Sequence, residues 1–498
     1  MVERSYDVVI VGSGAGGGTV AKELAPLARQ GLRVAVLEWG AKLRESEYTG
    51  REVEMADKLY FDSGGVLTRD RTMTLAFGRA YGGSTVVYTG TSLPLPEPVL
   101  ARWNVPGLEF ADLRRRSEKA LGENNVHLLE DDKLNDNNRL FNAACRRLGY
   151  RVQQFPINVK GCRGAGVCNL GCPNAAKQGT NRVQLPAAEA AGVEVVTNCK
   201  VEAIGERECT ATVANPPYGE PSRWEPGRYR IRARAIVVAG GAVNSPALLL
   251  RSRLPVRLPA LGRYLTAHPA LILVGEHEKP ITNYFGHPKS YYCDHFVDEG
   301  FLLETCMYFP FTTAKNLIGF GAEHAELMRR MDRMQMILVL AVDPALAENR
   351  VVLDRDGEPV VDYRFTDGVL DALVASQRAA ARIFFAAGCR RVHAPAGATF
   401  FIGASQAGRI DELITRAPFR LGKVSISSAH LMGGCRMGAD AAESVTDAWG
   451  QVHGVPWLFV ADGSLFPRCS EINPYVTIMA LADRVAERVR DRIAELPA

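Results

Sequence analysis

Short apolar runs and one glycine-rich turn alternate along the first forty residues. Residues 6–11 form an apolar run rich in β-branched side chains, which predicts a buried parallel strand. Residues 12–18 are glycine-rich, residues 19–29 have helical character, and residues 33–37 predict a second strand. Strand, glycine turn, helix and strand within about 33 residues predict a βαβ unit.

Further along the chain the pattern changes character twice. Residues 110–149 are charged and helix-prone, residues 193–197 and 235–239 predict further buried strands, and residues 215–227 predict a surface excursion rich in Pro and Gly. Between residues 271 and 361, short apolar segments at 271–276, 301–308 and 336–342 predict an antiparallel meander. One long amphipathic helix is predicted over residues 367–388, and small, glycine-rich segments return after residue 423.

The chain of 498 residues is too long for one compact core. The pattern predicts a discontinuous nucleotide-binding domain from residues 1–100, 175–270 and 424–498, with a sheet-based substrate domain, 271–423, inserted. Residues 101–174 are predicted to form a helical, cysteine-rich lid or contact segment.

Composition narrows the range of partners. The net charge is +4, with acidic and basic residues interspersed, so we expect neither nucleic acid nor an anionic membrane as partner. No apolar run reaches about 18 residues, so no membrane insertion is expected. The chain also opens without a leader pattern, and the odd count of eleven cysteines favours reduced thiols and a cytoplasmic location.

The glycine turn matches the dinucleotide-binding pattern G-x-G-x-x-G. It consists of Gly12, Ser13, Gly14, Ala15, Gly16 and Gly17, and Glu38 ends the following strand. Gly12 permits the tight turn, Gly14 lets the backbone approach a pyrophosphate, and Gly17 lets the helix pack on the sheet. Glu38 would accept hydrogen bonds from ribose hydroxyls, and its charge disfavours a 2′-phosphate. The pattern alone does not separate NAD from FAD.

The C-terminal segment carries the most specific signal. It contains Ala429-His430-Leu431-Met432-Gly433-Gly434-Cys435, then Ala461-Asp462-Gly463, then Asn473-Pro474-Tyr475-Val476-Thr477-Ile478. This segment resembles the end of the glucose–methanol–choline (GMC) oxidoreductases, most closely the cholesterol oxidase and bacterial alcohol dehydrogenase branch. The family's other motifs are matched, in order, by residues 12–17, 82–85, 241–252 and 261–269.

The resemblance implies an α/β fold, with a Rossmann-like FAD-binding domain and an inserted substrate domain of antiparallel sheet plus helices, as in the p-hydroxybenzoate hydroxylase architecture. It implies oxidation of a small-molecule alcohol by hydride transfer to FAD, with His430 as the base and Asn473 as its partner. O2 or another acceptor would reoxidise the flavin, and the oligomeric state stays open. Predicted cofactor contacts are Gly12, Ser13, Gly14, Ala15, Gly16, Gly17, Glu38, Trp39, Gly82, Gly83, Ser84, Val87, Val201, Ala239, Gly240, Asp462, Gly463, Asn473, Pro474 and Thr477.

Two features of the family pattern need separate treatment. Gly82-Gly83-Ser84-Thr85 matches the family's flavin loop, and Val86-Val87-Tyr88-Thr89 follows it. Many members carry Asn or a His bonded to the flavin soon after this loop, and this chain has neither there, so non-covalent FAD is predicted. His268 and His453 lie in turns that resemble turns of the family, and this resemblance implies structural roles for both residues. The other classes considered are a flavin-containing lyase and an electron-relay dehydrogenase subunit.

Cys162, Cys168 and Cys172 form a cluster in a glycine-rich segment. Three interpretations stay open: structural thiols near the active site, an iron–sulfur cluster or other metal, and a disulfide. Three ligands leave both a cubane and a closed zinc site incomplete, so neither iron nor zinc is expected.

Overall fold

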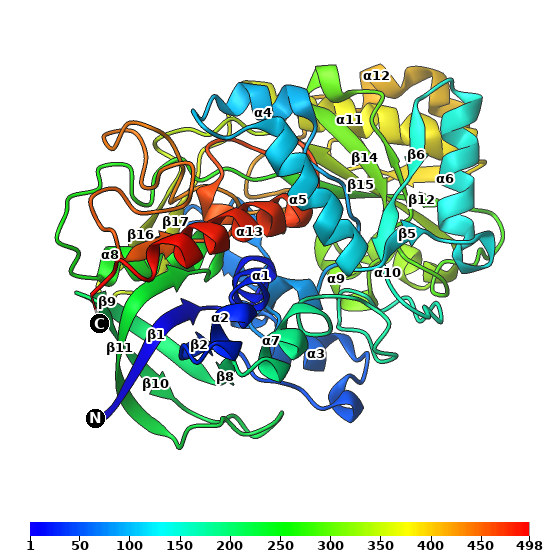
Figure 1. The fold of residues 1–498 in the computed structure, drawn as a ribbon. Coiled ribbons are helices and arrows are strands. Elements are labelled where there is room, and N and C mark those ends of the chain that lie inside the picture. The colour runs from blue at the N-terminus through cyan, green and yellow to red at the C-terminus, as the bar shows by residue number, and fades with distance from the viewer. Residues whose placement is uncertain (498) are drawn as a thin grey trace.

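The nucleotide-binding half is built on a seven-stranded sheet in a computed structural model that describes residues 1–497 (Figure 1). Strands β8 (Glu194–Val196), β2 (Val34–Leu37), β1 (Val2–Val11), β11 (Gly227–Val238) and β21 (Leu458–Val460) are parallel neighbours. The first half of β11 also pairs antiparallel with β10 (Glu208–Val213), which continues to β9 (Cys199–Gly205). The predicted buried strands are therefore present, and the surface excursion joins β10 to β11.

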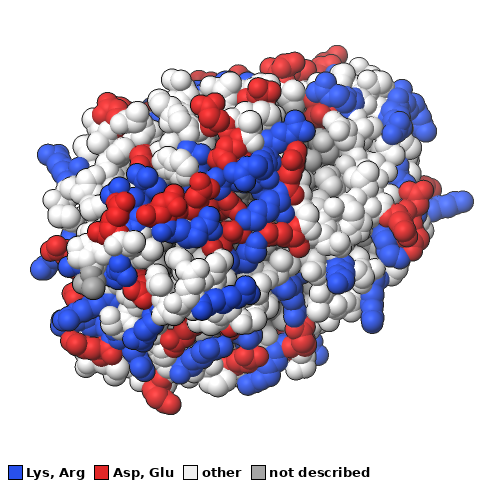
Figure 2. Space-filling view, in the orientation of Figure 1, with Lys and Arg blue, Asp and Glu red and all other residues white. Residues whose placement is uncertain are grey.

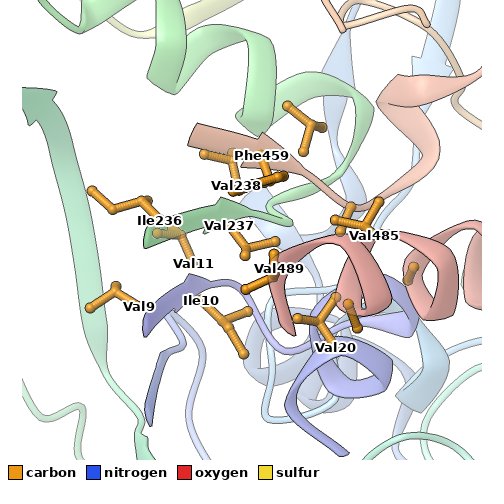
Figure 3. Packing of buried hydrophobic residues seen from close by; sticks show 14 of the residues in the cluster. Val9, Ile10, Val11, Val20, Ile236, Val237, Val238, Phe459, Val485 and Val489 are labelled. Atoms are coloured by element: carbon orange, nitrogen blue, oxygen red, sulfur yellow. The ribbon is translucent and has the colours of Figure 1, made fainter. Parts of the chain in front are cut away.

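The predicted helix of the βαβ unit is divided into two. Helix α1 (Ala15–Glu23) begins inside the glycine turn, and α2 (Ala25–Arg29) follows after Leu24. Pro26 occupies the first turn of α2, where the N–H that proline lacks would have no intrahelical partner. Because proline cannot donate the hydrogen bond that a continuing helix needs, α1 ends before it. The apolar residues of β1, β11 and β21 pack against α1 and α13 (Tyr475–Arg492), as Figure 3 shows for Val20, Val485 and Val489.

The substrate half contains a ten-stranded sheet. Its main order is β3 (Val66–Leu67), β4 (Met73–Leu75), β20 (Ile426–Ser428), β12 (Ala270–Glu276), β15 (Met334–Ala341), β14 (Phe301–Thr305), β13 (Tyr291–Cys293) and β6 (Val152–Gln154). β18 (Arg391–His393) pairs with β12 and with β19 (Ile402–Gly403). The predicted segments do pair antiparallel, but the meander is β13–β14–β15, and β12 pairs with the last of these strands.

Helices cover one face of this sheet. The predicted helix over 367–388 is α11 (Asp367–Ala386), whose first turn is capped by Thr366 accepting a hydrogen bond from the Val369 N–H. α11 packs on β12, β14 and β15, and α6 (Asp136–Arg147) packs on α11. β3, β4, β6 and β20 join this sheet although they lie outside residues 271–423, so sheet membership and the predicted domain ranges differ at these strands.

The remaining elements are short or connect the two halves. Two small sheets pair β5 (Val126–Leu128) with β7 (Pro156–Asn158) and β16 (Arg350–Leu353) with β17 (Pro359–Asp362). Within residues 1–497 no helix combines the length and the apolar character needed to cross a membrane. The other helices are α3 (Glu52–Leu59), α4 (Glu97–Trp103), α5 (Phe110–Glu123), α7 (Gln184–Ala190), α8 (Gly241–Arg251), α9 (Pro310–Asn316), α10 (Ala322–Met328) and α12 (Ile410–Leu413).

A charged network joins α5 to α13. Figure 2 shows acidic and basic side chains alternating over these two helices in the centre of the view. The side chain of Arg116 on α5 is only 3% exposed and pairs with Asp112, Asp483 and Glu487. Burial alone would raise the pKa of Asp112, but hydrogen bonds from Arg116 and other arginines lower it to about 2. This network therefore fixes α5 against the helix that follows Asn473.

Replacing Arg116 by Met should lower the free energy of unfolding by about 3 kcal/mol, because it removes the buried cation that Asp483 and the partly buried Asp112 and Glu487 share. The matched control is Arg114→Met, whose pair with Glu118 is exposed on both sides and should change stability by less than about 1 kcal/mol. Denaturant unfolding of both variants provides the measurement, and equal losses would show that the network does not stabilise the fold.

Candidate functional site

The turn between β1 and α1 is packed so closely that side chains are excluded at three of its glycines. A Cβ on Gly12, which has φ +99°, would lie 2.4 Å from the Ala239 carbonyl oxygen, and one on Gly17 would lie 2.0 Å from the Gly12 oxygen. A Cβ on Gly16 would lie 1.6 Å from the Ala461 oxygen. These contacts bring the carboxyl ends of β1, β11 and β21 to one edge of the sheet, the edge at which doubly wound folds bind ligands.

Gly14 differs from its neighbours. The nearest atom to a Cβ built there is the Gly83 Cα, 3.9 Å away, so protein packing does not require glycine at this position. The absence of a side chain instead leaves the backbone of the turn approachable. This is the property that a pyrophosphate on a helix N-terminus needs.

Glu38 is buried at the end of β2 and held by the turn itself. Its Oε2 accepts hydrogen bonds from the Ser13 N–H at 2.9 Å and the Ser13 hydroxyl at 2.6 Å, and its Oε1 accepts one from the Gly40 N–H at 2.6 Å. Burial raises its pKa. A carboxylate offers about four acceptor positions, so one remains for a ribose hydroxyl.

Ser13 also connects the first glycine turn to the second. Its hydroxyl oxygen accepts a hydrogen bond from the Gly82 N–H at 2.9 Å. Gly83 and Ser84 follow at the rim, and Val87 is buried. The sequence predicted these loops separately, and the structure joins them through one side chain.

The other predicted cofactor residues lie along the same edge. The Cys199 N–H donates to the Glu38 carbonyl at 2.8 Å, which places the start of β9, with Val201 two residues further on, near the end of β2. The half-buried Trp39 has Lys200 of β9 over its ring, with Nζ 4.6 Å from the centroid. At the far end, the carboxylate of Asp462 accepts hydrogen bonds from the Gly241 N–H at 2.7 Å and the Ser464 N–H at 2.8 Å. Ala239 and Gly240 directly follow β11, where the Ala239 carbonyl packs against Gly12, and Gly463 follows Asp462.

Helix α13 starts at Tyr475, with Pro474 as its N-cap residue and no side-chain cap. Its first N–H groups therefore lack intrahelical partners and carry the positive end of the helix dipole. Among residues 1–497, neither the buried hydroxyl of Thr477 in this first turn nor the buried hydroxyl of Ser464 has a hydrogen-bond partner. Together with the open approach at Gly14, these free donors fit an extended, polar dinucleotide such as FAD.

His430 and Asn473 meet in front of this helix. The Asn473 amide nitrogen lies 3.4 Å from Nε2 of His430, and the His430 N–H donates to the Ser428 hydroxyl at 3.2 Å. Burial, and secondarily the neighbouring His268 and Lys289, hold the pKa of His430 well below its usual range. His430 is therefore neutral at pH 7 and can accept a proton.

His268, for which sequence reasoning predicted only a structural role, contacts His430 directly. The two Nδ1 atoms are 3.0 Å apart, and Nε2 of His268 lies 3.0 Å from the Cys469 sulfur. The two histidines are separated by 162 residues, so no local pattern joined them.

The cysteine segment is fixed to the flavin loop by a lysine that sequence reasoning missed. The ammonium group of Lys177 donates to the carbonyl oxygens of Val86, Tyr88 and Cys168, each at 2.6 Å. Burial lowers the pKa of Lys177 to about 8. Cys162, Cys168 and Cys172 are free thiols, and within residues 1–497 no three His, Cys, Asp or Glu side chains are arranged to bind a metal ion.

Comparison with known proteins supports the resemblance. The family models for the N- and C-terminal parts of GMC oxidoreductases match residues 56–270 and 345–482. An uncharacterised GMC-type oxidoreductase of Mycobacterium tuberculosis is 35% identical over 97% of this chain and 75% of its own length. Long-chain-alcohol oxidase FAO4B of Arabidopsis thaliana is 28% identical over 98% of this chain and 67% of its own length.

Solved structures share the fold. Pyridoxine 4-oxidase from Mesorbium loti superimposes with a TM-score of 0.71 at 18% identity, over 98% of this chain and 99% of that one. Formate oxidase of Aspergillus oryzae RIB40 gives a TM-score of 0.73 at 15% identity, over 99% of both chains. These matches confirm the predicted two-part α/β architecture, and with the family models they show that the chain belongs to the GMC oxidoreductase family.

Proposed function

We propose that this protein oxidises an alcohol to an aldehyde or ketone, with His430 as the base that takes the hydroxyl proton. The observation that carries the proposal is the neutral His430, paired with Asn473 in front of the uncapped N-terminus of α13. The cofactor is FAD, as family membership and the residues of the sheet edge support. When bound, FAD supplies the acceptor for the hydride of the carbinol carbon.

The division of work between the two residues follows from their chemistry. Removing the hydroxyl proton makes the carbinol C–H bond easier to break as a hydride, and a neutral imidazole is a suitable proton acceptor at pH 7. Asn473 cannot take a proton at neutral pH, but its amide can hydrogen-bond the substrate oxygen and hold it beside Nε2. We therefore assign abstraction to His430 and orientation to Asn473.

The cofactor would be held by the groups already described. The Gly14 turn and α1 suit the pyrophosphate, and Glu38 suits a ribose. The start of α13 favours negative charge near Thr477. The carboxylate of Asp462 fixes the Gly241 and Ser464 amides at the strand ends that flank this path.

The sheet face beside the active histidines favours an apolar substrate. Ala270 of β12 pairs with Ser427 of β20, two strands that lie next to His268 and His430 in the sequence. Along β12, β14 and β15, side chains that are slightly exposed alternate with side chains that are fully buried. By register they form two neighbouring rows, and the ionisable residue on this face is Glu304, which is fully buried and paired with Lys289. The apolar members are Ala270, Ile272, Leu302, Leu338 and Leu340, which are 4–8% exposed.

Similarity to a long-chain-alcohol oxidase points to the same class of substrate. O2 or another acceptor would reoxidise the flavin. The cytoplasmic location stays a prediction, and the oligomeric state stays open. The lyase alternative has no observation in its favour. The electron-relay alternative would need a cysteine-bound cluster, and within residues 1–497 no three His, Cys, Asp or Glu side chains are arranged to bind a metal ion. The absence of iron and zinc stays a prediction for elemental analysis.

The first test concerns the base. His430→Ala should retain bound FAD but reduce its flavin about 10²- to 10⁴-fold more slowly in anaerobic stopped-flow with the best alcohol, because the general base is lost. Asn473→Ala should lose less. His127→Ala, at an exposed histidine, is the matched control and should behave as the wild type. If His430→Ala reduced its flavin at a rate near that of the wild type, His430 would not be the base.

A second test concerns the attachment of FAD. Val86, Val87 and Tyr88 offer no imidazole for a covalent bond, so acid precipitation should release all of the flavin as FAD. The denatured protein should then run on a gel without flavin fluorescence. A fluorescent protein band would contradict non-covalent binding, and recovery of NAD would contradict the choice of cofactor.

A third test concerns the substrate class. With primary alkanols of increasing length, kcat/KM should rise about fourfold per methylene until the apolar rows are covered, since burying a CH₂ group contributes about 0.8 kcal/mol. Leu338→Asn should flatten this rise, whereas Leu421→Asn, at a leucine 39% exposed, should leave it unchanged. Faster turnover of sugars or polyols than of alkanols would exclude an apolar substrate without affecting the assignment of His430.

A further inference from the structure

His268 lies in a directed hydrogen-bond chain that ends on the backbone. His430 Nδ1 and His268 Nδ1 are 3.0 Å apart, so one of them carries the proton that lies between them. His268 Nε2 faces the Cys469 sulfur at 3.0 Å, and this thiol in turn lies 3.8 Å from the Ala267 carbonyl oxygen. The carbonyl can only accept, so it gives the chain a direction.

Starting from the Ala267 carbonyl, each donor in this hydrogen-bond chain has one acceptor. The Cys469 thiol donates to Ala267, the Nε2–H of His268 donates to the sulfur, and Nδ1 of His268 is left as an acceptor for the Nδ1–H of His430. Nε2 of His430 then carries no proton. The Asn473 amide nitrogen, 3.4 Å from this Nε2, is a donor and fits the same arrangement.

We propose that His268 is a positioning residue that fixes the tautomer of His430, keeping Nε2 of His430 unprotonated and facing Asn473. This inference rests on the proposed function, because it concerns the same base. It adds that the base depends on a residue in another turn, 162 positions earlier in the chain. A second neutral imidazole behind the first can also stabilise the imidazolium that forms when His430 takes a proton, because its Nδ1 lone pair remains available.

Burial keeps the side chains of this hydrogen-bond chain uncharged. Burial lowers the pKa of His268 to about 4 and raises the pKa of Cys469 to about 12, so at pH 7 both groups are uncharged. The ionisable groups nearby are paired: Lys289 with Glu304 at 2.5 Å, and Asp343, near Cys469, with the hydroxyl of Tyr363. Burial raises the pKa of Asp343 to about 7, and the hydrogen bond from the Tyr363 hydroxyl acts in the opposite direction.

The direct test is the tautomer of His430 in the holoenzyme, read from ¹⁵N NMR of histidine-labelled protein and assigned by comparison with His430→Gln. The wild type should show a protonated Nδ1 and an unprotonated Nε2. His268→Leu should shift the population towards protonated Nε2 and lower kcat about 10- to 100-fold, as for other residues that orient an active imidazole, with little change in KM. His268→Asn, whose side-chain oxygen can replace Nδ1 as acceptor, should recover most of the rate and the wild-type tautomer.

Variants at the other end of the chain keep the proposal testable if the His268 variants do not fold. Cys469→Ser retains an acceptor for His268, so it should keep the wild-type tautomer and lose less of kcat than Cys469→Ala, which should lower kcat several-fold and mix the tautomers. A wild-type His430 protonated on Nε2 would overturn the proposal. So would equal losses in His268→Leu and His268→Asn with an unchanged tautomer, which would show a merely structural role. Failure of His430 as the base appears separately, as unimpaired flavin reduction in His430→Ala.

Discussion

The close approach of three strand ends to one turn is the constraint on which the rest of the structure depends. Gly12 lies against Ala239, and Gly16 lies against Ala461, so closely that a Cβ on either glycine would clash with the backbone opposite. This packing brings together segments from the start, the middle and the end of the chain. Because His430 and Asn473 flank the third strand in sequence, the same packing determines where the base lies relative to the nucleotide-binding turn.

The polar side chains that hold the backbone in position at this edge have hydrogen-bond partners within the protein. Glu38 holds Ser13 and Gly40, Asp462 holds Gly241 and Ser464, and Lys177 holds three carbonyl oxygens of two loops. Within residues 1–497, the groups without protein partners at this edge are of a different kind: the hydroxyls of Thr477 and Ser464 and the first N–H groups of α13. Rigid support with a few free donors at one end describes a preorganised site, in which the protein does not reorganise when charge develops.

Local motifs made the sequence informative about one part of this site. The βαβ unit and Glu38 lie in a segment whose residue order is tied to its geometry, so they could be predicted from a few neighbouring residues. The His430–Asn473 pair, 43 residues apart, was implied by the resemblance to the GMC family. The break at Pro26 needed only the rule that proline stops a preceding helix, which the sequence analysis did not apply.

Contacts between distant segments could not be predicted in this way. β4 and β20 pair although more than 300 residues separate them, and His268 meets His430 across 162 residues. Lys177 reaches the flavin loop from 91 residues away. Such contacts depend on strand register and on the packing of whole domains, which a single sequence does not encode in any local pattern.

The central claim is that this edge of the sheet supports removal of a proton and a hydride from one alcohol. The most direct measurement is the anaerobic rate of flavin bleaching with an alcohol deuterated at the carbinol carbon, compared with the unlabelled alcohol. The account predicts complete bleaching by the alcohol alone and a primary isotope effect of several-fold on its rate. A flavin that no alcohol bleaches, or one that bleaches at the same rate with both isotopologues when C–H cleavage is isolated, would contradict it.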